Sequence, residues 1–593
     1  MGKQGKKDGF ILQAGILAAA GIICRIIGLL YRSPLTAVIG DRGNGYYQSA
    51  YNIYTIILLI SSYSIPAAVS KVISQKLSLK EYRNAHRIFM CSMWYALAVG
   101  GIAGIFLFFG AGLLLEGPAV TVLKVFAPTI FLYGMLGVLR GYFQAHRTMV
   151  QTSVSQILEQ ILNALVSIGA ALFLIMTILG GADTYVLEDN GSVTFGGEAV
   201  AEKAIILLDE KGEAVLDELG YPVYTLTEEQ EKWNTQHATY GAVGSALGTG
   251  AGVLVALLFM WAVYGLNKSM IHKRIKHDKS GITDSYGKIF KLITSVVTPF
   301  ILSTAIYNLS TSLNQTIYTK LYMNIKGMAE KETFTNYGIF SGKAVVIRSI
   351  PLALSSAMSS AILPSVSTAW AREDYEDARA KVAKAVKVTM MISVPAAVGI
   401  GVLAKPVMQV LFPQKESLDM ASGLLMGLAV TVIFYALSTL TNSVLQGIGK
   451  VNTPVKNAGV ALIPQTVILA VLVCLTNVNL YGLVMADIVY SGLMCVLNQK
   501  ALRKYMGYKQ EVFRSFVTPL VASLFMGAAA WAVYQLLYML TSSNLISLIP
   551  AVIIAVIVYF ALEILLKGMS EEELRAIPKG HLLVKVAKKC RLL

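Results

Sequence analysis

Residues 140–154 read RGYFQAHRTMVQTSV, and residues 442–456 read NSVLQGIGKVNTPVK. Aligning Gln144 with Gln446 gives an offset of 302 residues. Six long apolar stretches separate the equivalent positions, so both copies keep the same orientation across a membrane. Parallel repeats of this kind are typical of transporters whose halves are related by an axis along the membrane normal and rock around a central site.

An acidic insertion makes the first copy longer than the second. Tyr240-Gly241 matches Tyr481-Gly482 at an offset of only 241 residues, so the offset falls by 61. The segment 181–239 carries 13 Asp/Glu and three Lys between two apolar stretches. Its runs 204–208 and 221–226 are bounded by turn residues and are typical of strands. The sequence predicts a small β-rich extracellular domain or a partly disordered flap. Both a lid or partner surface and a tolerated loop insertion are open interpretations.

The composition excludes a water-soluble protein. Of 593 residues, 55% are hydrophobic and 14% are charged, and the mean hydropathy is +0.61; soluble domains have about 25% charged residues. Apolar runs of about twenty residues are long enough to cross the bilayer as helices. We therefore predict an all-α integral membrane protein with about fourteen transmembrane helices: 10–31, 46–69, 88–115, 119–143, 153–180, 240–266, 289–322, 337–366, 385–412, 420–447, 455–476, 481–501, 514–540 and 545–567.

These spans predict the organisation of the chain. Two six-helix repeats form two lobes, and two C-terminal helices lie outside the repeat. The predicted parts are N-lobe helices one to five in 1–180, the insert in 181–239, helix six in 240–266, a basic cytoplasmic linker in 267–291, C-lobe helices in 289–501, helices thirteen and fourteen in 514–567, and a basic tail in 568–593.

The formal net charge of +16 follows membrane topology. Lys and Arg residues cluster after the second, sixth, twelfth and fourteenth predicted spans, and three lysines precede the first. Because cytoplasmic loops carry an excess of these residues, we expect a multi-pass plasma membrane protein with both termini in the cytoplasm. Nucleic acid is not expected as a partner. The basic tail could also contact anionic lipid.

Some cations lie within predicted spans or directly after one, where ionisable groups usually face a cavity or a partner. Arg25 and Arg32 are two helical turns apart and project from one face of the first helix. Arginine binds phosphate or pyrophosphate oxygens in bidentate geometry. Lys343 and Arg348 lie in the eighth helix, about 140° apart around its axis. All four are candidates for substrate binding. The alternatives are that Arg32 reaches the outer interface and that Arg25 pairs with a carboxylate.

Uncharged polar residues and the carboxylate of Glu159 also fall within spans. Glu159 belongs to a stripe with i, i+3, i+4, i+7 spacing on the fifth helix. It could titrate, bind a coupling cation, neutralise an arginine of helix one, or pack as a buried carboxylate. The candidates for ion coupling or for lining a cavity are Gln156, Glu159, Gln160, Asn163, Asn52 and Asn314. Asn52 also suits an interhelical hydrogen bond.

Motifs for enzymatic chemistry are not found. The sequence contains no G-x-x-x-x-G-K-[ST] phosphate loop, which ATP hydrolysis by that route requires. Its five cysteines and six histidines lack metal-ligand spacing. We therefore expect no metal, no cofactor and no enzymatic activity.

Several short motifs in order along the chain resemble a known family. They are RIIG (25–28), GNGYYQSAYNIY (43–54), IPAAVSK (65–71), QGIGK (446–450) and RAIPKG (575–580). With them, the chain resembles the multidrug/oligosaccharidyl-lipid/polysaccharide (MOP) exporter superfamily, and within it the MurJ-like lipid II flippases and the stage V sporulation protein B family.

The resemblance implies a bilobed fold that alternates between inward-open and outward-open states. It implies a cationic central cavity for an undecaprenyl-pyrophosphate head group, helices thirteen and fourteen that hold the lipid tail, and coupling to Na⁺, H⁺ or the membrane potential. Arg25 matches the helix-one arginine of the family, and Arg32 matches its second arginine within about one residue. Lys343 and Arg348 stand where flippases of Gram-negative bacteria have a different charge arrangement.

The expected function is export of lipid II, or a related lipid-linked glycan, from the cytoplasmic to the outer leaflet during synthesis of the cell wall or spore cortex. Membrane lipids and cell-wall synthesis proteins are the expected partners. The main alternative is an ion-coupled multidrug or metabolite antiporter of the same superfamily, which would have an acidic and aromatic cavity. A membrane scaffold without transport would leave the charges within the spans unexplained.

Overall fold

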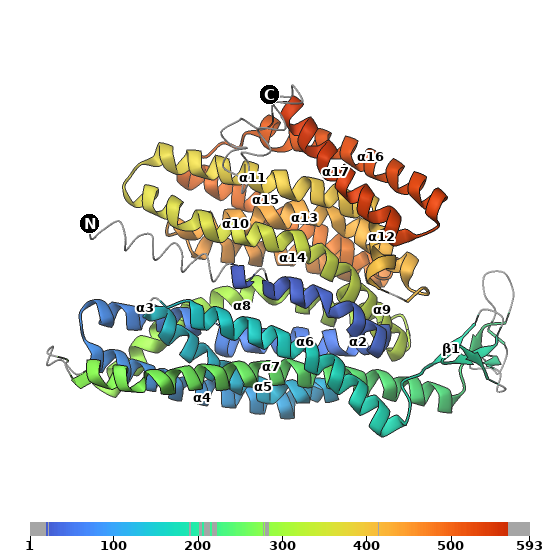
Figure 1. Cartoon of the computed structure of the whole chain (residues 1–593), viewed down its shortest axis with the longest axis horizontal. Coiled ribbons are helices and arrows are strands. Elements are labelled where there is room, and N and C mark those ends of the chain that lie inside the picture. Colours follow the sequence, from blue (N-terminus) through green and yellow to red (C-terminus); the bar gives the residue numbers. More distant parts are fainter. Residues whose placement is uncertain are drawn as a thin grey trace. The chain divides into compact units, whose positions relative to one another are not determined.

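The computed structural model is almost entirely helical (Figure 1). The predicted tail 568–593, except Gly568, and the beginning of the first predicted span lie outside the described residues. The structure describes residues 19–568 apart from residues 22, 64, 147, 189–190, 201–203, 207–213, 216–221, 277, 279–283, 413 and 567.

The chain divides into two compact units. Unit 1 consists of residues 1–298 and 329–338, and unit 2 of residues 299–328 and 339–593. Helix α8 (Tyr286–Asn324) begins in unit 1 and ends in unit 2. The other helices of unit 1 are Ala19–Leu30, α2 (Arg32–Leu58), η1 (Leu59–Tyr63), α3 (Ile65–Ser78), α4 (Tyr82–Leu114), α5 (Ala119–Ala145), α6 (Val150–Leu179), α7 (Glu228–Lys276) and most of α9 (Glu330–Ile339). Those of unit 2 are η2 (Phe340–Ala344), α10 (Val345–Ala371), α11 (Tyr375–Val402), α12 (Ala404–Leu411), α13 (Leu418–Gly447), α14 (Asn452–Leu475), α15 (Tyr481–Met506), η3 (Phe513–Val517), α16 (Thr518–Thr541) and α17 (Asn544–Leu565).

Ten described helices are long and apolar enough to cross a membrane. The count is eleven if the bent pair Ala19–Leu30 and Arg32–Ser62, with an angle of 47°, forms one span. The predicted number of about fourteen is not confirmed. The predicted spans outside these ten fall on the bent pair, on α8, and on α9 to α10.

A turn at Gly40 divides α2. Its φ of 67° and ψ of 178° are non-helical, so the helical path from Arg32 ends there and a new one begins at Asp41. This backbone region is open almost only to glycine, because a Cβ would clash with the neighbouring peptide groups. The turn lies between the predicted spans 10–31 and 46–69.

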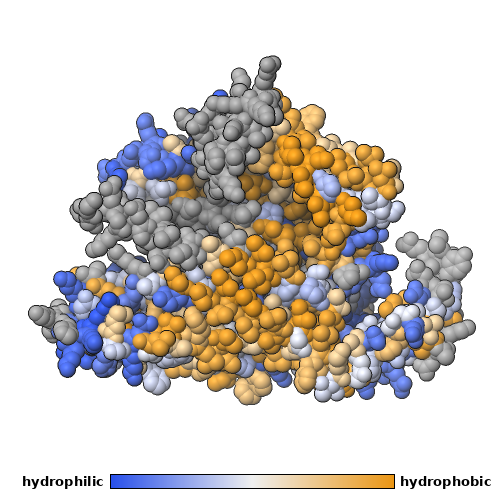
Figure 2. Space-filling model, in the orientation of Figure 1, coloured by the Kyte–Doolittle hydropathy of each residue, from blue (hydrophilic) through white to orange (hydrophobic). Residues whose placement is uncertain are grey.

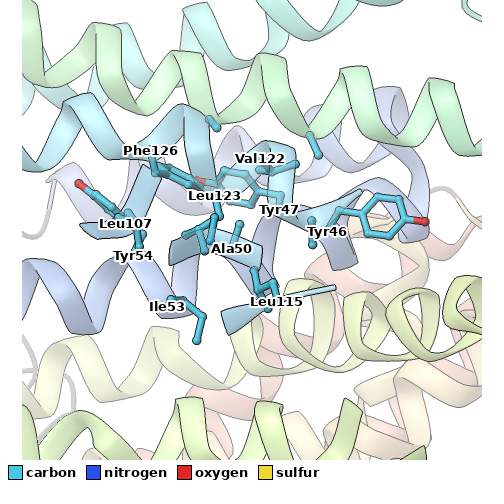
Figure 3. Packing of buried hydrophobic residues seen from close by; sticks show 14 of the residues in the cluster. Tyr46, Tyr47, Ala50, Ile53, Tyr54, Leu107, Leu115, Val122, Leu123 and Phe126 are labelled. Carbon is cyan, nitrogen blue, oxygen red and sulfur yellow. The ribbon is translucent and has the colours of Figure 1, made fainter. Parts of the chain in front are cut away.

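Aromatic rings form the centre of unit 1. Tyr46, Tyr47 and Tyr54 of α2 are buried together with Phe126 of α5, and Figure 3 shows their packing with aliphatic side chains from α4 and α5. The rings of Tyr54 and Phe126 stack with centroids 4.6 Å apart. Offset aromatic pairs add to the stabilisation that burial provides. The motif 43–54 therefore contributes much of the core of unit 1.

Glycines allow α6 and α7 to approach closely. Gly244, Gly248 and Gly252 are four residues apart on α7, and each faces the backbone of α6. A Cβ on Gly248 would lie 2.4 Å from the backbone nitrogen of Ser167. The spacing is the small-xxx-small pattern with which membrane helices associate. It fixes α6, which carries the polar stripe, against α7.

The described part of the insert contains two small antiparallel sheets, which confirms the prediction of strands in this segment. They are β1 (Tyr185–Leu187), β2 (Val193–Phe195) and β3 (Glu198–Ala199), and β4 (Ile205–Ile206) paired with β5 (Tyr224–Thr225). Strands β4 and β5 fall within the runs 204–208 and 221–226. Helix α7 begins at Glu228, so the last part of the predicted insert is helical.

The first turns of α7 hold the three-stranded sheet. Asn234 exchanges two hydrogen bonds with the backbone of Tyr185, and the indole nitrogen of Trp233 donates to the carbonyl oxygen of Asp183 at 3.0 Å. On the same segment, Glu231 forms ion pairs with Arg42 of α2 at 2.7 Å and with Lys331 of α9 at 3.3 Å. The insert is thus fastened to the helices of unit 1.

At the opposite end of unit 1, polar contacts attach the linker between α7 and α8. Lys76 forms ion pairs with Glu81 at 2.8 Å and with Asp284 at 2.9 Å. Asn84 donates to Glu81 and accepts from the backbone of Asp284. The hydrogen bonds from Lys76 and Asn84 lower the pKa of Glu81 below its ordinary value.

Unit 2 has its main core between α10, α11, α13 and α15, and a second cluster joins α16 to α17. The phenol of Tyr559 in α17 donates to the carbonyl oxygen of Met391 in α11 at 2.9 Å. Tyr534 of α16 donates to the amide oxygen of Asn544 at 2.9 Å. The C-terminal helix pair is therefore packed onto α11 within this unit.

Hydrophobic side chains cover the middle of the unit 1 helices in Figure 2, and hydrophilic ones gather at their left end. On α4, Phe109 and Leu113 are 78% and 82% exposed. Such extended apolar exposure would be unfavourable in water and suits contact with lipid chains. The chain is a multi-pass membrane protein.

Gly40→Ala should lower stability through backbone strain alone. No heavy atom lies within 4 Å of the added Cβ, so steric contact contributes nothing. Holding a non-glycine residue in this region costs about 1–3 kcal/mol. Thermal unfolding in detergent should show a lower midpoint for Gly40→Ala than for the wild type. Equal midpoints would mean that the turn relaxes without cost.

Gly248→Ala should separate α6 from α7. The added methyl group overlaps the Ser167 backbone, and overpacking of this kind costs about 1–3 kcal/mol. Gly265→Ala on the same helix is the matched control, because its Cβ meets no atom within 4 Å. We expect a lower unfolding midpoint for the first variant and an unchanged or higher one for the second. A similar loss in both variants would contradict the close approach.

Candidate functional site

The two cations of helix one lie on either side of a bend. Arg25 is exposed on Ala19–Leu30, and Arg32 is partly buried at the start of α2. The seven-residue spacing predicted that both arginines project from one face of a straight helix. The 47° angle between the two segments means that they lie on two differently directed helices instead. Neither side chain forms a hydrogen bond or ion pair with a described residue. Arg32 lies near enough to Tyr51 for an electrostatic interaction.

The polar stripe of α6 meets α5 through an ion pair. Arg140 of α5 is 5% exposed, and its Nη2 donates to Glu159 Oε2 at 2.7 Å. Its Nε donates to the hydroxyl of Ser155 at 2.9 Å. Glu159 is therefore neutralised by Arg140, and not by an arginine of helix one. Removing either partner would leave a charge in a poorly hydrated site.

The rest of the stripe is also partly buried and faces neighbouring helices. A Cβ on Gly28 would lie 3.2 Å from Gln160 Nε2, which places helix one against α6. The amide oxygen of Asn163 accepts from the hydroxyls of Ser167 at 3.0 Å and Thr249 at 3.4 Å. Gln156 lies on the same helix one turn before Gln160. The stripe thus lies between protein helices, as a polar stripe in a membrane requires.

In unit 2, Arg348 belongs to a three-residue network. Its guanidinium pairs with the carboxylate of Asp487 on α15 and lies 5.0 Å from the centroid of the Tyr435 ring on α13. The Tyr435 phenol donates to the other carboxylate oxygen at 3.1 Å. Arg348 therefore has a partner of opposite charge that the sequence analysis did not identify.

Lys343 is deeply buried in the π-helical turn η2. The side chain is 1% exposed, its Nζ donates to the Ser417 hydroxyl at 2.6 Å, and it lies 5.7 Å from the centroid of the Phe412 ring. A cation over an aromatic face is stabilised by the ring quadrupole. In this structure Lys343 interacts with its own unit.

The two candidate asparagines make interhelical hydrogen bonds. Asn52 of α2 donates to the phenol of Tyr337 on α9 at 2.7 Å. Asn314 of α8 accepts from the amide of Gln465 on α14, and Ser310 donates to the same amide at 2.9 Å. Amide networks of this kind join membrane helices.

Sequence reasoning did not single out Arg140 and Asp487, although a signal existed for both. Each is an ionisable residue inside or at the edge of a predicted span, which marks a functional or paired position. Within the described residues, no group of three His, Cys, Asp or Glu side chains is placed to hold a metal ion.

Among the candidate site residues of unit 1 and their partners, the arginines outnumber the carboxylates. Glu159 is paired with Arg140, and no described carboxylate pairs with Arg25 or Arg32. This arrangement favours an anion near helix one, because two guanidiniums can donate several hydrogen bonds to phosphate oxygens.

Two family descriptions match the chain. "Lipid II flippase MurJ" matches residues 113–551, and "Polysaccharide biosynthesis protein" matches residues 12–187. The chain is 24% identical to the lipid II flippase MurJ of Bacillus subtilis (strain 168), over 87% of this chain and 86% of that protein. It is 20% identical to stage V sporulation protein B of the same organism, over 98% of this chain and 100% of that protein.

Solved structures share the fold. Lipid II flippase MurJ in an inward closed conformation aligns with a TM-score of 0.60 and 13% identity, covering 93% of this chain and 98% of that one. An outward-facing multidrug resistance MATE family transporter of the MOP superfamily aligns with a TM-score of 0.53 and 15% identity, covering 84% and 95%. Because the first family match spans well over half of its length, the chain belongs to the family of lipid II flippase MurJ.

Proposed function

We propose that the chain is a flippase that moves an undecaprenyl-pyrophosphate-linked cell-wall precursor, lipid II or a related lipid-linked glycan, from the cytoplasmic to the outer leaflet by alternating access. Membership in the family supports a transporter or flippase. The observation that carries the choice of an anionic substrate is the uncompensated pair Arg25 and Arg32, beside a glutamate that is already neutralised.

The pyrophosphate of such a precursor is the group that these arginines would bind. It carries its charge on several oxygens, which match the planar fork of guanidinium donors. Away from bulk water the attraction between these charges is stronger than in solution. An exposed Arg25 can meet the head group first, and the partly buried Arg32 can hold it nearer to the tyrosines of α2.

An ion-coupled multidrug or metabolite antiporter is the alternative, and the shared fold with a MATE family transporter favours it. Such a transporter would need an acidic site for a cationic substrate. The carboxylates of Glu159 and Asp487 are both paired with arginines, which argues against this function. We propose that transport is coupled to Na⁺, H⁺ or the membrane potential, and that Glu159 is the residue that responds to this driving force.

The proposed location is the bacterial plasma membrane with both termini in the cytoplasm, as the placement of Lys and Arg suggests. The partners in this proposal are the lipid-linked substrate, membrane lipids and cell-wall synthesis proteins.

Arg25→Ala should abolish the proposed activity. In a bacterium depleted of its own lipid II flippase, we expect the wild-type chain to restore growth and surface-exposed lipid II. Loss of a charge-assisted bidentate contact should reduce this exposure at least about tenfold. Lys268→Ala is the matched control, because Lys268 is an exposed cation at the end of α7. Arg25→Lys should rescue only in part.

The comparison requires equal amounts of each variant in the membrane. Full rescue by Arg25→Ala would remove Arg25 from the substrate site. A correctly inserted wild-type chain that fails to rescue would favour another lipid-linked glycan or the antiporter branch.

The ion pair in unit 2 allows a double-variant test. Asp487→Leu and Arg348→Met should each lower stability by about 3–5 kcal/mol, because the remaining charge is buried without a partner. The combined variant should recover most of this loss, as measured by thermal unfolding. If Arg348 contacts the substrate as well as Asp487, the combined variant will fold but will not expose lipid II. A stable and fully active combined variant would restrict Arg348 to a structural role.

A further inference from the structure

A cavity of about 140 Å³ lies within unit 1, away from the proposed transport residues. It is formed where α4 begins and where α5 and α7 end, and the charge pattern suggests that these ends face the cytoplasm. The polar residues that line it include Tyr82, His86, Tyr142, His146, Gln151 and Arg274. Neither Arg25 nor Arg32 lines this cavity.

Two polar atoms in this lining are buried without a described hydrogen-bond partner. They are Nδ1 of His86 on α4 and Oε1 of Gln151 on α6. Buried polar atoms in native proteins are nearly always hydrogen-bonded, so each unpaired atom indicates a missing partner. Because an amide oxygen can only accept, the partner of Gln151 at this atom must be a donor such as a hydroxyl group.

Arg274 is the main positive charge of the cavity. Burial lowers the pKa of His146 below its ordinary value, and this favours a neutral ring at neutral pH. His146 Nδ1 lies 2.9 Å from the carbonyl oxygen of Tyr142 and donates to it, so a neutral His146 ring presents Nε2 as an acceptor. The electrostatic influence of Arg274 on His146 places the guanidinium beside that ring.

We propose that this cavity binds a hydroxylated phosphate ester. The phosphate accepts hydrogen bonds from Arg274, and the hydroxyl groups donate to Gln151 Oε1 and to His146 Nε2. Tyr82 and Tyr142 form flanking walls against which the carbon chain of a glycerol or sugar unit can pack. The head group of phosphatidylglycerol and soluble glycerol 3-phosphate share this chemistry and are the two sources to be distinguished.

Binding can be measured with the purified full chain in phosphatidylcholine nanodiscs. Soluble glycerol 3-phosphate is titrated while thermal unfolding is followed, because a ligand that binds the folded state raises the unfolding midpoint. A second preparation contains phosphatidylglycerol in the nanodisc and no soluble ester. Two variants change the charge of the cavity. Arg274→Gln removes its cation, and Gln151→Glu adds a negative charge. The controls are Lys276→Gln, an exposed cation on the same helix end, and Arg25→Ala.

We expect at least one probe to raise the midpoint of the wild type and of both controls. Arg274→Gln and Gln151→Glu should weaken the response at least about tenfold in ligand concentration. A response to glycerol 3-phosphate identifies a soluble ligand, and a response confined to phosphatidylglycerol identifies a lipid head group.

Three results would overturn the proposal. The first is no rise in the midpoint with either probe. The second is an equal loss of response in Arg274→Gln and Lys276→Gln, which would indicate unspecific attraction to the basic surface. The third is inorganic phosphate binding as tightly as glycerol 3-phosphate, which would exclude a role for the hydroxyl groups. Retained binding in Arg25→Ala would show that failure of the flippase proposal leaves this site intact.

Discussion

Charged side chains inside a hydrocarbon layer must be paired, and each unit satisfies this requirement with an arginine and a carboxylate from different helices. Arg140 and Glu159 join α5 to α6, and Arg348 and Asp487 join α10 to α15. In unit 1, Arg25 on Ala19–Leu30 and Arg32 on α2 are further cations beside a glutamate that is already paired. This excess of positive charge is why they favour an anionic ligand.

The two units use their remaining polar groups differently. In unit 2, Lys343 and Asn314 are buried and bonded to neighbouring side chains, which stabilises a fixed arrangement. In unit 1, the stripe of α6 is only partly buried, and its neighbour in helix one carries an exposed arginine. A ligand could reach the polar groups of unit 1 with less rearrangement than those of unit 2.

The sequence was sufficient for features that depend on local pattern. Hydropathy indicated a chain of membrane helices, and the runs 204–208 and 221–226 indicated the two strands that pair as β4 and β5. It was not sufficient for contacts between distant residues. Glu159 lies 19 residues from Arg140 and Asp487 lies 139 residues from Arg348, and helical periodicity cannot say which helices become neighbours. The first predicted span, 10–31, ends close to the bend after Leu30, but the residue pattern did not predict the 47° angle between the two helical segments. The glycine spacing at 244, 248 and 252 was present in the sequence and would have placed α7 against another helix.

Helix α7 has 49 residues, and at 1.5 Å per residue it is about 74 Å long, more than twice the thickness of the hydrocarbon layer. Its first turns hold the sheet of β1, β2 and β3 through Trp233 and Asn234, and its last turns carry Arg274. No proline interrupts it, and its middle is pressed against α6 at Gly248. One continuous helix therefore joins the sheet to the Arg274 end, so these two parts of unit 1 cannot shift along the helix axis independently of each other.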